Sequence, residues 1–217
     1  LERLSLLGQM SAQVAHEIKN PLNAIKGSAH YLRSNFEGAI LDEFLQVIET
    51  ESERLSDIVS DFLNFSKPGP PVMETAQVQN VVQESAQLVR SEMADKGIDL
   101  GIHSDPEVLP FAFDQAKVKQ ALLNLLINAA EATPSGGKVR ISMEKVNSSV
   151  RIAVADSGPG LTEEQAENLF KPFYTTKVRG SGLGLAIAEQ NIRDHNGRIE
   201  VLNNPGQGAV FTIVLPV

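Results

Sequence analysis

His16, Glu17 and Asn20 place an imidazole, a carboxylate and an amide within little more than one helical turn. Apolar residues around them, such as Val14 and Ile18, recur at steps of three and four, which is typical of a helix packed against other helices. At about 100° per residue, His16 points away from this apolar seam, and Asn20 lies one turn further along the same face. A neutral imidazole can act as a nucleophile, and the neighbouring carboxylate can orient it or accept its second proton.

A lone exposed histidine is more often simply solvated, so these residues alone leave both a nucleophile and a surface histidine open. His30 falls near the same face two heptads later but has no acid beside it, and we interpret it as solvated. The choice for His16 therefore depends on the rest of the chain.

Composition excludes several classes of protein. The 217 residues are 42% hydrophobic, enough for one or two globular domains, and no apolar run approaches the roughly 18 residues that cross a bilayer. A net charge of -8 without a basic stripe disfavours a nucleic-acid partner. The absence of cysteine fits the cytoplasm. The chain begins with Leu1, inside a helical apolar pattern and without an initiator methionine. We therefore expect a cytoplasmic fragment of a longer protein that carries a sensor or a membrane segment before it.

Two amphipathic helices are expected in the first third of the chain. The first spans residues 1–36 and is bent by Pro21, and residues 37–39 form a loop. The second carries a regular apolar seam and ends at the proline-rich linker 68–71. Because one helical hairpin cannot bury both seams, we predict a homodimer through residues 1–67, in which two hairpins form a four-helix bundle.

Strand and helix patterns mix over residues 72–217, which predicts an α/β sandwich with helices on one face of a mixed sheet. The expected strands are 72–75, 97–103, 138–146, 150–156, 198–202 and 209–215. The expected helices are 78–96, one capped by Asp114, 163–169 and 184–195. The fold class is therefore a two-domain α+β chain.

Asn124 and Asn128 lie four residues apart on the helix face opposite an apolar stripe. An amide oxygen can bind a Mg²⁺ ion that keeps several waters and phosphate oxygens, with an ordinary polar helix face as the alternative. Asp156 follows an apolar strand directly and precedes Gly158 and Gly160. Its carboxylate can accept a hydrogen bond from an adenine amino group, although an ordinary turn would use the same residues.

Residues 170–177 place aromatic side chains before two hydroxyls and an ammonium, and residues 180–184 alternate glycines at the start of a helix. Backbone N–H groups at such a helix start attract phosphates. The glycine loop is not a dinucleotide fingerprint, because no strand leads directly into it.

Taken in order, five segments resemble the catalytic core of bacterial sensor histidine kinases: HEIKNP, NLLINAAEA, DSGPG, FKPFYTTK and GSGLGL. The resemblance covers essentially the whole chain. It implies a dimerisation and phosphoacceptor hairpin (1–67), a linker (68–71) and an ATP-binding domain of the gyrase B and MutL type (72–217). The short stretch between Gly160 and Gly182 is similar to short-lid members such as nitrogen-regulation kinases.

The resemblance implies that His16 accepts the γ-phosphoryl group of ATP, with Glu17 as its acid–base neighbour. It implies that Asn20 places water when the partner regulator is dephosphorylated, and that Asn128 binds Mg²⁺. The remaining implied nucleotide contacts are Asn124, Asp156, Gly158, Gly160, Phe170, Phe173, Thr175, Thr176, Lys177, Gly180, Ser181, Gly182, Leu183 and Gly184. The implied partner is the receiver domain of a response regulator, whose aspartate takes the phosphoryl group.

Some residues depart from the resemblance or restrict it. Related hydrolysing ATPases carry a glutamate where this chain has Asn124, and an amide cannot activate water as a base, so transfer is favoured over hydrolysis. Glu131 and Ala209 stand where lysine and threonine are common, which removes one phosphate contact and one hydroxyl near the adenine. The alternatives are a nucleotide-binding scaffold without transfer and a plain ATPase.

Overall fold

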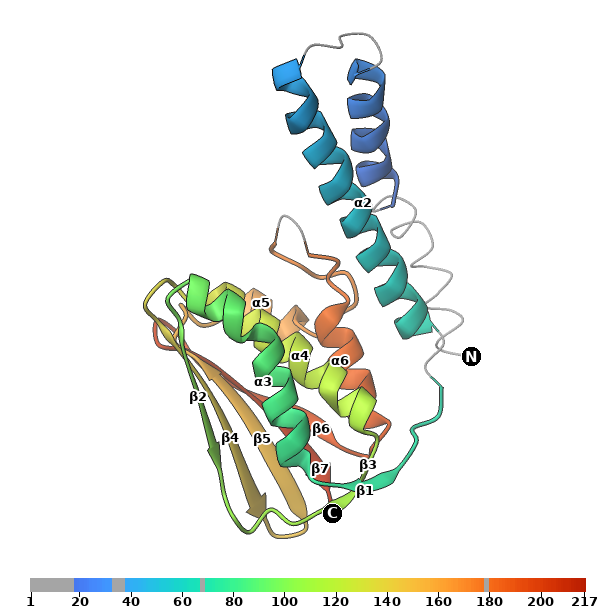
Figure 1. Cartoon of the computed structure of the whole chain (residues 1–217). Coiled ribbons are helices and arrows are strands. Elements are labelled where there is room, and N and C mark those ends of the chain that lie inside the picture. The colour runs from blue at the N-terminus through green and yellow to red at the C-terminus, as the bar shows by residue number, and fades with distance from the viewer. Residues whose placement is uncertain (1–17, 33–37, 67–68, 178–179) are drawn as a thin grey trace. The chain divides into compact units, whose positions relative to one another are not determined.

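The computed structural model describes residues 18–32, 38–66, 69–177 and 180–217 (Figure 1). The chain divides into two compact units. One holds the N-terminal helical segments together with Thr175–Leu183, and the other holds Gly69–Tyr174 and Gly184–Val217. Among the helices in the described ranges, none combines the length and the apolar character needed to cross a bilayer.

The first unit contains a helical hairpin, built from residues 18–32 and from α2 (Gly38–Ser66). The rings of Tyr31 and Phe44 stack with their centroids 4.5 Å apart and join the two helices. The predicted loop over residues 37–39 is wrong for Gly38 and Ala39, which belong to α2. Alanine favours helix, and a glycine at the very start of a helix is well tolerated, so both fit its first turn.

Several apolar side chains of this hairpin are exposed in the single chain. Leu22 is 50% exposed and Leu63 is 56% exposed, and Leu45 and Val59 are also exposed. A hairpin that leaves such residues in water has apolar surface available for another helical partner.

The second unit is built on a five-stranded sheet in the order β2-β4-β5-β7-β6. Only β2 and β4 pair in parallel, and the other neighbours are antiparallel, so the sheet is mixed as predicted. The strands are β2 (Asp99–Ser104), β4 (Lys138–Val146), β5 (Ser149–Asp156), β6 (Arg198–Asn204) and β7 (Gly208–Pro216). A separate two-stranded sheet pairs β1 (Glu74–Ala76) with β3 (Phe111–Phe113).

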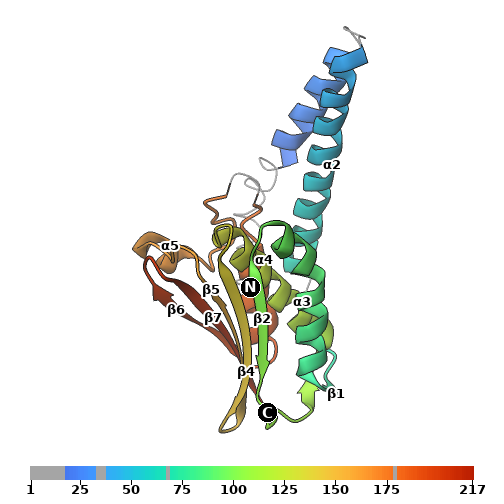
Figure 2. The same cartoon turned by 60° about the vertical axis from the view of Figure 1, so that its left-hand side comes forward.

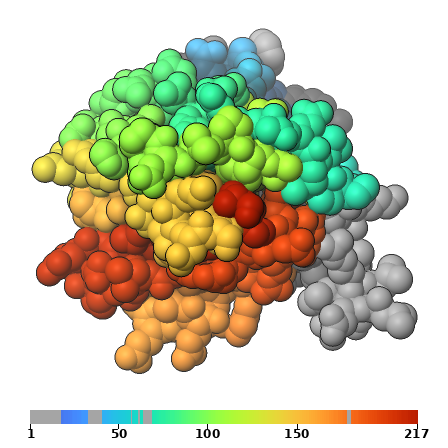
Figure 3. Space-filling view, turned by 90° about the horizontal axis from the view of Figure 1, so that it is seen from below, coloured from blue at the N-terminus to red at the C-terminus, as the bar shows by residue number. Residues whose placement is uncertain are grey.

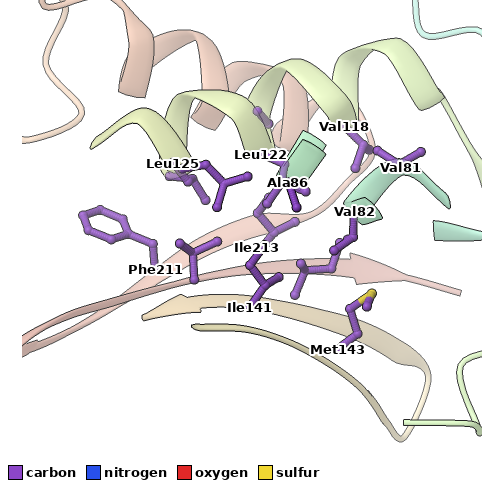
Figure 4. Close-up of a cluster of buried hydrophobic side chains, with 14 of the residues drawn as sticks. Val81, Val82, Ala86, Val118, Leu122, Leu125, Ile141, Met143, Phe211 and Ile213 are labelled. Atoms are coloured by element: carbon purple, nitrogen blue, oxygen red, sulfur yellow. The ribbon is translucent and has the colours of Figure 1, made fainter. Parts of the chain in front are cut away.

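The long helices of this unit lie on one face of the sheet (Figures 1 and 2). They are α3 (Val78–Asp95), α4 (Gln115–Ala132) and α6 (Gly184–Arg193), and the short α5 (Glu163–Asn168) precedes α6. The core lies between helices and sheet, where Val82 and Leu122 face Ile141 and Ile213 (Figure 4). All four side chains are almost completely buried, so this layer stabilises the unit through the hydrophobic effect. The predicted α+β class, with helices on one face of a mixed sheet, is confirmed.

Val217 is held at the end of the sheet opposite Asp156. The N–H of Val217 donates to the carbonyl of Ser148 at 2.9 Å, next to the turn between β4 and β5. Figure 3 shows the C-terminal end, in dark red, beside this turn, in yellow. Asn147 allows the tight turn because it adopts a left-handed conformation (φ 54°), which asparagine tolerates.

Two strand predictions differ from the structure. The expected strand 97–103 begins only at Asp99, because Gly97 (φ 69°) ends α3 and the N–H of Ile98 returns to the carbonyl of Met93. The expected strand 72–75 is shifted to Glu74–Ala76 by its pairing with β3. Since β3 has only three residues, its sequence pattern was too short to predict it.

Candidate functional site

Asn124 and Asn128 lie on α4, whose opposite face is buried in the core. Asp114 begins this helix as its N-cap, with its carboxylate accepting the N–H of Lys117 at 3.0 Å. Both asparagines are partly exposed, as the spacing predicted. The side-chain amide of Asn124 donates to the carbonyl of Gly184 at 2.7 Å. Asn124 therefore ties α4 to the first residue of α6, directly after the glycine loop.

Asp156 ends β5, and backbone groups on both sides hold its carboxylate. Its Oδ1 accepts the N–H of Gly158 at 2.8 Å, and its Oδ2 accepts the N–H of Ala209 at 3.3 Å. Each carboxylate oxygen can accept more than one hydrogen bond, so these contacts orient the group without exhausting it. The side chain is partly exposed. It can therefore present a fixed acceptor to a ligand.

Glycine is required at two positions next to Asp156. A Cβ on Gly158 would lie 2.6 Å from the carbonyl oxygen of Ala132, closer than real Cβ atoms approach. A Cβ on Gly208 would lie 1.9 Å from the carbonyl oxygen of Asp156, and the φ of Gly208 is 99°. The backbones of α4, the loop after β5 and β7 therefore meet closely around the carboxylate.

The far side of the same loop is held by Asn203 of β6. Its amide accepts the N–H of Leu161 at 2.8 Å and donates to the carbonyl of Leu161 at 2.7 Å. Gly160 has a φ of 76°, and a Cβ there would meet the Asn203 oxygen at 2.8 Å. Sequence reasoning missed Asn203 and Gly208, because nothing in their local sequence indicates which distant loop they contact.

Phe170 and Phe173 follow α5, which begins with a capping box between Thr162 and Gln165. Phe170 is partly buried and packs on the core, and Phe173 is 6% exposed. Phe173 has a φ of 64°, which is unusual for a bulky residue. Such a backbone conformation costs free energy and is found mostly where the surrounding structure holds it, often at ligand sites.

Residues 175–183 belong to the other compact unit and are described by themselves. Thr175, Thr176 and Lys177 are exposed, and the Thr175 hydroxyl accepts the N–H of Lys177 at 3.1 Å. The Ser181 hydroxyl accepts the N–H of Leu183 at 3.3 Å. The other predicted residues of this segment are the partly exposed Gly180 and Gly182, the latter with a φ of 67°.

The predicted phosphoacceptor pair, His16 and Glu17, lies outside the described residues. Asn20 is exposed on the helix over residues 18–32, as expected from its face. His30 is likewise exposed on that helix.

Over the described residues, no cluster of three or more His, Cys, Asp or Glu could hold a metal ion. A metal bound here would need a ligand such as the amide oxygen of Asn128 together with oxygens from a phosphate and water. That donor set fits Mg²⁺, which commonly keeps several waters and takes few protein ligands.

Two family models match the chain. The model for histidine kinase-, DNA gyrase B-, and HSP90-like ATPases matches residues 113–217, and the His Kinase A (phospho-acceptor) domain model matches residues 6–71. The solved catalytic domain of the histidine kinase ThkA is 36% identical, with a TM-score of 0.62, and the match covers 67% of this chain and 95% of that one. The chain belongs to the histidine kinase family.

Longer relatives agree with this membership. The structure of histidine kinase ThkA in complex with the response regulator protein TrrA is 35% identical with a TM-score of 0.84, covering 99% of this chain and 63% of that one. The signal transduction histidine-protein kinase AtoS of Escherichia coli is 37% identical over 217 residues, and this histidine kinase chain spans 36% of its length. The expected ATP-binding fold of the C-terminal part is confirmed by the ATPase family match.

Proposed function

We propose that this chain transfers the γ-phosphoryl group of ATP to His16, and that the group then passes to an aspartate in the receiver domain of a response regulator. One observation carries this proposal. Backbone N–H groups fix the carboxylate of Asp156 where it can receive a nucleotide, and the N-terminal part of the same chain matches a phospho-acceptor domain. We assign residues 1–67 to dimerisation and phosphotransfer, 68–71 to the linker, and 72–217 to ATP binding.

In this proposal the Asp156 carboxylate accepts a hydrogen bond from the adenine amino group. Backbone N–H groups already orient both of its oxygens, and the side chain is partly exposed. Gly158 and Gly160 shape the adenine pocket indirectly, because their lack of a Cβ lets the loop pack closely on Ala132 and on Asn203. Phe170 and Phe173 anchor the start of the lid, residues 175–183.

The phosphates meet the lid, with Thr175, Thr176 and Lys177 and the loop Gly180–Gly184 as their contacts. Asn128 binds Mg²⁺, and Asn124 lines the same face of α4. When bound, Mg²⁺ supplies positive charge that neutralises the phosphate oxygens.

The transfer step forms a bond between an imidazole nitrogen of His16 and the γ-phosphorus. The bond from that phosphorus to the oxygen bridging the β-phosphate breaks, and ADP leaves with the electron pair. Glu17 accepts the proton from the imidazole. Little covalent chemistry is needed from the protein beyond positioning and charge stabilisation, which is the general case for phosphoryl transfer.

Two features support transfer over hydrolysis. Asn124 occupies the place of the water-activating glutamate, and an amide cannot accept the proton of water. Its amide N–H group is also engaged with the carbonyl of Gly184, so the side chain already serves to join α4 and α6.

Exposed apolar residues of the hairpin, Leu22, Leu45, Val59 and Leu63, support a homodimer through residues 1–67. The solved complex of ThkA with the response regulator TrrA supports a regulator as the second partner. Because Asn20 lies exposed on the helix that follows His16, we also propose a phosphatase activity toward the phosphorylated regulator.

The test is incubation of the full chain with γ-labelled Mg-ATP, followed by measurement of acid-labile, base-stable label on the protein. We expect His16→Gln to lose the label and His30→Gln, the matched control, to keep it. Label that survives in His16→Gln would contradict the proposed acceptor. Steady phosphate release without labelled protein would favour a plain ATPase, and nucleotide binding without either product would favour a scaffold.

A further inference from the structure

The chain that enters the second compact unit is held by polar contacts to the N-terminal end of α4. The ammonium of Lys117 donates to the carbonyl of Gly69 at 2.7 Å, and the N–H of Val72 donates to Oδ2 of Asp114 at 2.8 Å. Lys117 also pairs with Asp194, at 2.5 Å. We call Asp114, Lys117 and Asp194 the linker anchor.

Burial cannot hold this segment in place. The apolar side chains of Val72 and Met73 are 64% and 49% exposed. Pro70 and Pro71 have no N–H, so Val72 carries the first backbone donor after Gly69. The segment is therefore fixed mainly by its two hydrogen bonds to Asp114 and Lys117.

The linker anchor is itself built into the fold. Asp114 is 8% exposed and also caps α4 through the N–H of Lys117. Its own backbone N–H donates at 2.9 Å to Nε2 of His195, which is 4% exposed. The side chains of Lys117 and Asp194 are only 14% and 17% exposed, so removing one would leave a largely desolvated charge without its ion-pair partner.

The same helix carries the linker anchor and the proposed nucleotide ligands. Asn124 and Asn128 follow Lys117 along α4 by about 10 Å and about 16 Å, at 1.5 Å per residue. A rigid helix thus fixes the point where the linker leaves the unit relative to the bound nucleotide.

We propose that Lys117 and Asp114 are positioning residues for phosphoryl transfer. By holding Gly69–Val72 on the ATP-binding unit, they limit the tether between this unit and α2, which ends at Ser66, to residues 67 and 68. The transfer part of this inference rests on the proposed histidine kinase activity, whereas the anchoring itself does not.

Loss of the linker anchor would lengthen the tether to residues 67–73, since β1 begins at Glu74. The effective concentration of a tethered partner falls roughly as the −3/2 power of tether length, which predicts about sixfold slower labelling. ATP affinity should not change, because the anchored segment contacts the N-terminal end of α4, about 10 Å along the helix from Asn124 and about 16 Å from Asn128.

The experiment compares Lys117→Met with Lys117→Arg in the full chain, at saturating Mg-ATP. Methionine keeps the length of the side chain but donates no hydrogen bond, whereas arginine can still reach both acceptors. Three quantities are measured: the rate of labelling, the affinity for ATP, and the hydrogen exchange of the Val72 amide. A second pair, Val72→Pro and Val72→Ala, removes or keeps the donated N–H without changing α4.

We expect the double variant Lys117→Met/Val72→Pro to label about sixfold more slowly with unchanged ATP affinity. Each single variant keeps one of the two contacts and should slow labelling by less. Lys117→Arg and Val72→Ala should behave like the unaltered chain, and the Val72 amide should exchange at least tenfold faster in Lys117→Met. Unaltered labelling in the double variant, or unaltered exchange of the Val72 amide in Lys117→Met, would overturn the inference. If the unaltered chain takes no label, the proposed function fails, and the exchange comparison still decides whether the linker anchor exists.

Discussion

The carbonyl oxygen of Asp156 and the α-carbon of Gly208 are so close that a Cβ on Gly208 would lie 1.9 Å from that oxygen. The adjacent N–H, that of Ala209, donates to the Asp156 carboxylate. The first residues of β7 therefore both crowd the end of β5 and orient its functional group. The close contact between the backbones of Gly208 and Asp156 therefore affects both the stability of the β5–β7 pairing and the orientation of the Asp156 carboxylate.

Gly208→Ala should accordingly impair both folding and nucleotide binding. The methyl group would push β7 away from β5, and we expect the free energy of unfolding to fall by about 2–4 kcal/mol. We expect ATP affinity, measured by equilibrium dialysis, to fall more than tenfold.

The matched control for this change is Gly206→Ala. Gly206 also has a positive φ, 77°, but a Cβ there would meet no atom within 4 Å. Only backbone strain remains, costing about 1 kcal/mol. Equal losses of ATP affinity in both variants would argue against the role of the close approach at Gly208.

Asn128→Ala should abolish Mg-ATP-dependent labelling. Removing the amide oxygen removes the proposed protein ligand of Mg²⁺, and we expect the labelling rate to drop by about 100-fold or more. The control is Asn80→Ala, which removes an exposed asparagine from α3. Normal labelling of Asn128→Ala over a range of Mg²⁺ concentrations would refute the assignment of the metal ligand.

Asn20→Ala should leave labelling intact and slow the dephosphorylation of the regulator, by roughly tenfold, because a positioned water is lost. The measurement is the decay of label on a purified, phosphorylated receiver domain after addition of the variant. Asn23→Ala is a suitable control, since Asn23 is also exposed and lies on the next turn of the same helix. Unchanged decay with Asn20→Ala would remove the proposed phosphatase role from this residue.

Elements with strong local patterns could be predicted from the sequence. The apolar spacing predicted α2 and α3 to within a few residues, and alternation around residues 147–149 predicted the hairpin of β4 and β5. The apolar strand pattern that stops before Gly158 correctly predicted that Asp156 is the last residue of β5. In these segments hydrophobic period and turn chemistry agree with the final fold.

Long-range contacts could not be predicted in this way. Asp114 and His195 are far apart in sequence, and only the packing of α4 beside α6 brings them into contact. His195 is 4% exposed, and its Nδ1 lies 2.7 Å from the carbonyl oxygen of Asn191, so both ring nitrogens contact backbone groups of the same unit.

Acid should weaken the second unit through Asp114. Burial raises the pKa of its carboxyl, but hydrogen bonds from the N–H groups of Lys117 and Val72 outweigh this and hold the pKa below its ordinary value. A carboxyl whose pKa is lower in the folded than in the unfolded state stabilises the fold above its unfolded pKa. That stabilisation is lost as pH falls through the folded pKa.

Asp114→Asn removes this titration while keeping a good helix N-cap. At neutral pH we expect the variant to be less stable by about 1 kcal/mol, because an amide has a single acceptor oxygen and one of the two backbone N–H groups, that of Lys117 or that of Val72, loses its acceptor. The difference from the unaltered chain should begin to shrink as pH falls below the ordinary pKa of aspartate, about 3.9, because the unfolded carboxyl then takes up a proton, and it should vanish below the folded pKa. Urea unfolding at pH 7 and pH 3 measures both values. A difference that stays constant between the two pH values would show that the ionised form of Asp114 does not stabilise the fold.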